Sequence, residues 1–233
     1  LQLGEALAKG LLGRQAGARP AKILLSELST GRTFTYQAMD AWSGRFAQGM
    51  QVLGVARASH VAVLMENSAE HIALFFAIGK LGAVSVPVNT AARGALLRYY
   101  LSHAECTTAV VDASLFERPS EVLPEVPLLQ RVIVVGRLDA LAPTPPNVAV
   151  HSLDNLRGAD GPELADQGVE CHELLMLAFT SGTTGPSKAS MLSHAAALTY
   201  GTGAAEAQRY RSSDIFYVCL PPFQDRKNTR TNP

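Results

Sequence analysis

The sequence predicts an α/β protein with a doubly wound, mainly parallel sheet and helices on both faces of that sheet. Segments such as "HVAVLM" (60–65) and "RVIVVG" (131–136) are apolar without polar alternation, which is typical of strands buried on both faces. The segments between them carry apolar residues three or four positions apart, as amphipathic helices do. Strands that alternate with such helices indicate parallel pairing.

The first elements along the chain are predicted from turn and capping residues. Residues 22–36 have the pattern of two short strands around a Ser-Thr-Gly turn. Thr35 is expected to cap a helix that ends at Gly54, and Ser68 is expected to begin a second helix that ends near Gly82.

The later elements continue the alternation. Further strands are expected at 83–88, 107–112, 173–180, 189–193 and 214–220, with helices at 95–104 and from a cap at Ser193 to Ala207. The proline-rich segment 141–148 and the polar segment 157–170 are expected to be surface loops. Residues 224–233 hold no aliphatic or aromatic side chain and are predicted to form an unstructured tail.

Composition excludes several classes of protein. The 233 residues carry a formal net charge of zero, which argues against a nucleic-acid partner. The longest apolar stretch, 72–88, is interrupted by Lys80 and Pro87, so no membrane span is predicted. The three cysteines show no CxxC spacing and the histidines show no ligand spacing, which favours a reduced, cytoplasmic protein without a metal site.

One segment stands out for its chemistry: "FTSGTTGPSK", residues 179–188, follows a predicted buried strand. Glycines let successive backbone N–H groups converge on an anion, and hydroxyls add donors. The same composition also suits a plain turn between two strands, and composition alone does not separate the two. The spacing differs from the Walker A motif and from the esterase elbow, and "GTGAAE" (201–206) lacks the third glycine of a dinucleotide fingerprint.

This segment, followed by "MLSH", resembles the phosphate-binding loop of the adenylate-forming superfamily, which includes acyl-CoA synthetases. "TFTYQAMDAWSGRFAQGMQVLGV" and "VAVLMENSAEHIALFFAIGKLGAVSVPVN" are similar to two earlier segments of that family. This chain departs from the usual x-P-K-G ending, because it has Pro-Ser-Lys and then Ala189. The resemblance covers most of residues 30–220.

The resemblance implies a site and a reaction. The residues expected to contact the β- and γ-phosphates of ATP are Thr180, Ser181, Gly182, Thr183, Thr184 and Gly185, with Lys188 close by. A small-molecule carboxylic acid would attack the α-phosphorus, and coenzyme A would then take the acyl group. The resemblance assigns no catalytic residue to this chain, and it places the ligand of Mg²⁺ beyond residue 233.

The resemblance also implies a division of the chain. Residues 1–223 are expected to form an incomplete large N-terminal domain of an adenylate-forming enzyme, followed by the tail at 224–233. Within it, about 46–205 would be one α/β subdomain, while 1–45 and 206–223 would belong to a neighbouring sheet. Family enzymes are about twice as long and end in a small domain with a catalytic lysine, so this chain is expected to be truncated and inactive alone. The alternative is a non-catalytic remnant that binds nucleotide weakly or not at all.

Overall fold

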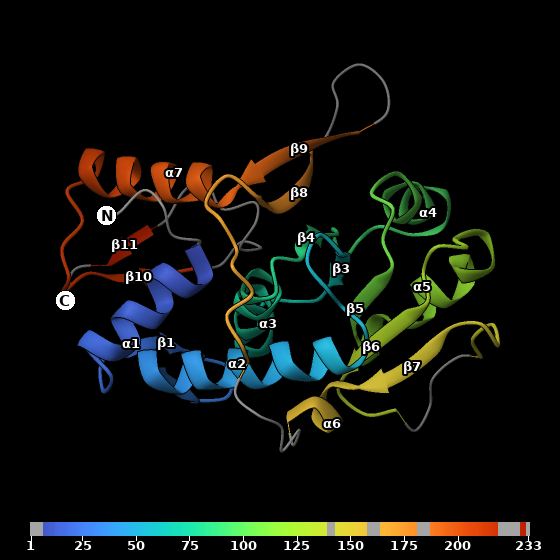
Figure 1. The fold of residues 1–233 in the computed structure, drawn as a ribbon, viewed down its shortest axis with the longest axis horizontal. Helices are drawn as coiled ribbons and strands as arrows, with labels where there is room; N and C mark the ends of the chain where they lie inside the picture. Colours follow the sequence, from blue (N-terminus) through green and yellow to red (C-terminus); the bar gives the residue numbers. More distant parts are fainter. Residues whose placement is uncertain (1–6, 139–142, 158–163, 181–186, 219–228, 232–233) are drawn as a thin grey trace.

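The computed structural model describes residues 7–138, 143–157, 164–180, 187–218 and 229–231 (Figure 1). Its largest sheet has seven described strands in the order β7-β6-β5-β3-β4-β8-β9. Their bounds are β3 His60–Leu64, β4 Val84–Pro87, β5 Thr108–Asp112, β6 Arg131–Val135, β7 Ala149–Ser152, β8 Leu174–Thr180 and β9 Lys188–Ser193. Neighbouring strands are parallel except for β8 and β9, which are antiparallel. The mainly parallel sheet predicted from the sequence is confirmed.

Helices cover both faces of this sheet (Figure 1). On one face α2 (Tyr36–Val52), α3 (Ala69–Lys80) and α6 (Leu153–Arg157) bury a core that includes Val61 and Val63. On the other face α4 (Gly94–His103) and α5 (Glu117–Val122) bury a core that includes Ala62 and Leu64. Because successive strand residues point to opposite faces, one short apolar strand supplies both cores. This is the doubly wound arrangement that the alternation of strands and helices predicted.

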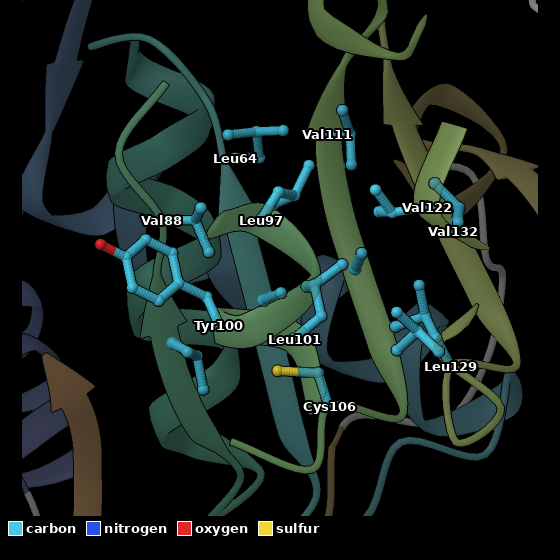
Figure 2. Close-up of a cluster of buried hydrophobic side chains, with 14 of the residues drawn as sticks. Leu64, Val88, Leu97, Tyr100, Leu101, Cys106, Val111, Val122, Leu129 and Val132 are labelled. Atoms are coloured by element: carbon cyan, nitrogen blue, oxygen red, sulfur yellow. The ribbon is translucent and has the colours of Figure 1, made fainter. Parts of the chain in front are cut away.

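Figure 2 shows part of the second core, where Leu97 and Leu101 of α4 lie against Val111 and Val132 of the sheet. Cys106 lies in the same cluster and is fully buried. Burial raises the pKa of the Cys106 thiol to about 12, so this side chain acts as a small apolar residue rather than as a nucleophile.

The predicted helix ends are confirmed. Thr35, Ser68 and Ser193 each accept a hydrogen bond at 3.1 Å from the backbone N–H three residues later. The side-chain oxygen therefore satisfies one of the donors that an α-helix leaves open at its N-terminus. Gly54 and Gly82 have φ values of +85° and +66°, the left-handed conformation in which a helix commonly ends.

The predicted hairpin is also confirmed and is attached to α3 by charged groups. β1 (Ile23–Ser26) and β2 (Thr33–Thr35) pair antiparallel. Beyond β1, Glu27 accepts a hydrogen bond at 3.0 Å from the backbone N–H of Ala69, in the first turn of α3. Arg32 donates two bonds of 2.8 Å to the carboxylate of Glu70 in the same turn. The Glu27 carboxylate thus occupies the positive end of the α3 dipole.

Several elements were not predicted. A π-helix, η1 (Leu7–Gly13), and the short α1 (Arg14–Ala18) precede the hairpin. Two 3₁₀ turns, η2 (Ala113–Leu115) and η3 (Leu123–Glu125), flank α5, while β7 and α6 follow the proline-rich segment. These elements are short, so their sequences offer too few turns or alternations to show a period.

The prediction of an unstructured tail is wrong in part. β11 (Thr229–Thr231) pairs antiparallel with β10 (Ile215–Tyr217), in register from Ile215 opposite Thr231. An isolated strand such as β10 exposes unpaired backbone groups, and β-branched threonines adopt the extended backbone that satisfies them. The rest of the predicted tail, 224–228 and 232–233, lies outside the described residues, as do 219–220 of the predicted last strand.

Among the described residues, no helix combines the length and the apolar character that crossing a membrane requires.

Close packing of α2 on α6 gives a first testable prediction. A Cβ placed on Gly49 would lie 2.6 Å from Cβ and 3.1 Å from Cα of Leu156, which is buried in α6. Gly49→Ala should therefore destabilise the protein by about 1–3 kcal/mol, because the helices must separate. On the same helix, a Cβ on Gly44 meets only Lys80 Nζ, at 3.8 Å. Gly44→Ala should be neutral or stabilising, by up to about 1 kcal/mol, because alanine favours helix.

Urea unfolding of the two variants and the parent measures both effects. Equal stability of Gly49→Ala and Gly44→Ala would contradict the close approach of α2 and α6.

Candidate functional site

The segment with unusual chemistry joins two adjacent strands at one end of the sheet. β8 pairs in parallel with β4 and antiparallel with β9, and the last pair before the connection is Thr180 with Lys188. The hydroxyl of Thr180 donates to the carbonyl oxygen of Lys188 at 3.3 Å. The connection therefore begins at the carboxyl end of β8, on the edge where the parallel strands also end. Ligands of open α/β sheets bind at that edge.

The structure brings together two of the predicted site residues, Thr180 and Lys188, both of which are exposed. The other predicted contacts to phosphate lie outside the described residues: Ser181, Gly182, Thr183, Thr184 and Gly185. Backbone pairing joins Thr180, directly before these five positions, to Lys188, which follows them in the chain, so the segment starts and finishes on neighbouring strands.

An aromatic cluster on α4 supports this connection, and the sequence analysis did not predict it. The ring centroid of Phe179 lies 4.4 Å from that of Tyr100 and 6.1 Å from those of Tyr99 and His103. Tyr99 also stacks on His103, with centroids 5.1 Å apart. The sequence signal was the aromatic run "RYYLSH", but nothing local indicates that it meets a residue some eighty positions later.

The same helix contacts the far end of the connection. The hydroxyl of Tyr99 donates to the carbonyl oxygen of Ser187 at 2.7 Å. The hydroxyls of Tyr100 and Ser187 lie 3.4 Å apart. In Figure 2 the Tyr100 hydroxyl points away from the other labelled side chains, out of the apolar cluster. One face of α4 therefore contacts the chain both before and after the segment.

Polar side chains at the ends of the neighbouring strands accept hydrogen bonds from nearby backbone N–H groups. Asp112, at the end of β5, accepts a hydrogen bond of 2.7 Å from the backbone N–H of Glu66, just after β3. Burial is the main cause that raises the pKa of Asp112, and nearby Glu66 and Glu70 add to it. Asn89, after β4, accepts from the N–H of Ala91 at 2.8 Å. These contacts shape the loops at this edge.

Two histidines that follow strands of the sheet, His71 after β3 and His194 after β9, are buried. His194 begins α7 (His194–Ala207) directly after the Ser193 cap, and its backbone N–H donates to the carbonyl oxygen of Glu173 at 3.1 Å. Burial lowers the pKa of His194, while the charge of Glu173 opposes that shift. Burial likewise lowers the pKa of His71, whose Nδ1 lies 3.3 Å from the carbonyl oxygen of Glu66. Within the described ranges, no group of three His, Cys, Asp or Glu side chains is placed to hold a metal ion.

The lowered pKa values of His71 and His194 predict that the stability of the protein depends on pH. Their pKa values in the folded protein lie below the ordinary value of 6.5, so the unfolded chain binds protons first as the pH falls. Stability should be highest above that value and should fall as the pH drops toward the folded-state pKa values. We expect His71→Gln to lose less stability than the parent between pH 7.5 and 5.5.

Thermal melts across this pH range check the expectation, with His172→Gln as the control at an exposed position. A parent and a His71→Gln variant with parallel curves would show that His71 does not carry the effect.

The sequence of the chain matches a family of known enzymes. The family model described as "AMP-binding enzyme" matches residues 12–227. A long-chain-fatty-acid–CoA ligase of Mycobacterium tuberculosis is 30% identical over 216 residues, covering 91% of this chain and 40% of the ligase. A 3-hydroxybenzoate–CoA ligase of an Aromatoleum species is 27% identical over 221 residues, covering 95% of this chain and 39% of that protein. The chain thus spans about two fifths of the length of these relatives.

Solved structures share the fold. A long-chain-fatty-acid–CoA ligase from Archaeoglobus fulgidus superposes with a TM-score of 0.75 at 22% identity, over 90% of this chain and 41% of that one. A Mycobacterium tuberculosis fatty acyl CoA synthetase gives a TM-score of 0.63 at 28% identity, over 81% of this chain and 34% of that one.

Proposed function

Because the chain belongs to the AMP-binding enzyme family, we propose that it serves the ATP-dependent activation of a carboxylic acid for transfer to coenzyme A. The carboxylate attacks the α-phosphorus of ATP, which gives an acyl-adenylate and releases pyrophosphate. The thiol of coenzyme A then takes the acyl group and releases AMP. The relatives named above are CoA ligases of long-chain fatty acids and of an aromatic acid, so both acid classes are candidates.

The observation that carries the proposal is the place of the glycine- and hydroxyl-rich segment. It connects β8 to β9 at the edge where the parallel strands end, and its flanking residues are paired with each other. Backbone amides free of Cβ atoms there would converge on the phosphates, and hydroxyls would add donors. The residues assigned to the β- and γ-phosphates are Thr180, Ser181, Gly182, Thr183, Thr184 and Gly185.

Lys188 completes the proposed site. Its backbone is held opposite Thr180, and its side chain is exposed rather than buried in the sheet. An ammonium at this position would supply a point charge to the phosphate chain. Aligned donors and a fixed charge would stabilise the negative charge that grows on pyrophosphate as it leaves.

The proposed reaction uses Mg²⁺ as a cofactor and coenzyme A as a co-substrate. We assign no described residue to Mg²⁺ and propose no catalytic residue in this chain. A cytoplasmic location is also proposed. Cys106 and Cys171 are free thiols, as a reducing compartment would leave them.

The test is carboxylate-dependent exchange of pyrophosphate into ATP. Since the chain covers 40% of the Mycobacterium tuberculosis ligase, the assay uses a chimaera in which residues 1–233 replace the matching part of that ligase. Long-chain fatty acids and hydroxybenzoates form the acid panel, and the unmodified ligase is the positive control. We expect exchange that depends on one acid class. A folded chimaera that shows no pyrophosphate exchange with any acid of the panel would contradict the proposal.

A further inference from the structure

Both described ends of the segment between β8 and β9 contact the same helix. Before the segment, the ring of Phe179 lies against Tyr100, with centroids 4.4 Å apart. After it, the carbonyl oxygen of Ser187 accepts the 2.7 Å hydrogen bond from Tyr99. α4 therefore contacts the chain where it leaves β8 and where it enters β9.

We propose that Tyr99 is a positioning residue of the phosphate site: its hydroxyl sets the orientation of the peptide between Ser187 and Lys188. This inference rests on the proposed function, because the segment so held is the one assigned to the phosphates of ATP. Tyr99 acts through the backbone and does not itself contact the nucleotide.

The helix that carries Tyr99 is a fixed support. Leu97 and Leu101 of α4 are 1% and 2% exposed and lie in the core on that face of the sheet. Tyr99 is restrained further by stacking on His103. A hydroxyl on a ring held in this way has little freedom, so its bond to Ser187 fixes the acceptor rather than following it.

The peptide that Tyr99 holds is the one next to Lys188. The Ser187 carbonyl and the Lys188 N–H belong to one planar unit, so orienting the carbonyl also orients the amide and the start of the lysine backbone. Lys188 is paired on its other side with Thr180. A side-chain donor and a strand partner together define where the Lys188 backbone lies, and therefore where its side chain starts.

The neighbouring tyrosine provides a matched control. The hydroxyl of Tyr100 faces the Ser187 side chain at 3.4 Å, near the limit of a hydrogen bond. Tyr100→Phe and Ser187→Ala each remove one partner of this weak contact and leave the Ser187 carbonyl in place. Tyr99→Phe removes the strong contact and keeps the ring.

The experiment compares these three variants with the parent chain of residues 1–233. Hydrogen–deuterium exchange of the peptide 179–190 is measured without ligand, and pyrophosphate affinity is measured by calorimetry. We expect Tyr99→Phe to speed exchange and to weaken pyrophosphate binding, each by about threefold to tenfold, the effect of one lost hydrogen bond. Tyr100→Phe and Ser187→Ala should match the parent, and all three should melt within a few degrees of it.

The outcomes separate the positioning role of Tyr99 from the proposed function. Exchange in Tyr99→Phe equal to that of the parent overturns the positioning role. Faster exchange with unchanged pyrophosphate affinity shows that the contact orders the chain without serving the phosphate site, which also overturns it. A parent that binds no pyrophosphate overturns the proposed function, and with it the inference, whatever the exchange shows.

Discussion

Replacing Gly182 with valine is expected to lower the rate of adenylation by a factor of about 10²–10³, or roughly 3–4 kcal/mol. A side chain at this position would obstruct the close approach of backbone amides to the phosphates, and a branched one would also restrict the backbone. Thr183→Ala removes a single hydroxyl donor and should act in the same direction. Both variants are measured in the chimaera by pyrophosphate exchange at saturating acid.

The loop assignment has two controls. Gly203→Val on α7 adds the same side chain where a Cβ meets no other atom within 4 Å, so adenylation should be retained. Transfer of the acyl group from supplied acyl-adenylate to coenzyme A should suffer less than adenylation in Gly182→Val, because pyrophosphate has already left. Parental adenylation rates in folded Gly182→Val and Thr183→Ala would mean that the segment is only a turn.

Phe46→Ala is expected to cost about 3–5 kcal/mol of folding free energy, a large part of the stability of an ordinary domain. The Phe46 side chain is fully buried between α2 and the sheet. Its ring lies 5.3 Å from that of Trp42, which in turn stacks on Phe34 at 4.9 Å. Removing the ring leaves a cavity and takes the support from this aromatic row.

Chemical denaturation of Phe46→Ala measures this loss, with Val52→Ala on the same helix as the control. Val52 is 82% exposed, so its truncation should change stability by less than about 0.5 kcal/mol. Similar stabilities for the two variants would contradict the placement of α2 against the sheet.

Sequence reasoning predicted best those features that local chemistry determines. The capping residues Thr35, Ser68 and Ser193 act on backbone N–H groups three positions away, so the signal and its effect lie in one stretch of sequence. The core strands are apolar throughout because both faces are covered. This property could be read without knowing which helices cover them.

The features that escaped prediction depend on distant partners. Tyr99 and Ser187 are far apart in the sequence, and only the tertiary fold, which brings α4 against the chain near the end of β8 and the start of β9, places the hydroxyl at the carbonyl. β11 exists because the backbone of β10 offers a partner. A list of side chains in 224–233 could not reveal that pairing.

The unusual order of the motif also gains a physical context. Where the family pattern has proline before lysine, this chain has Ser187 before Lys188. Serine here brings a hydroxyl within 3.4 Å of Tyr100, while its carbonyl binds Tyr99. The departure from the pattern therefore lies at the position that α4 contacts, and the backbone acceptor used by Tyr99 does not depend on the side chain.

The central claim is that residues 180–185 and Lys188 bind the phosphate chain of ATP, and an NMR titration tests it most directly. Pyrophosphate is added to the ¹⁵N-labelled chain of residues 1–233 and to its Gly182→Val variant, and every backbone amide is followed. We expect saturable shifts concentrated at the amides of 180–188 in the parent and lost in the variant. Shifts elsewhere with unmoved amides at 180–188, or no shifts at all, would contradict the claim.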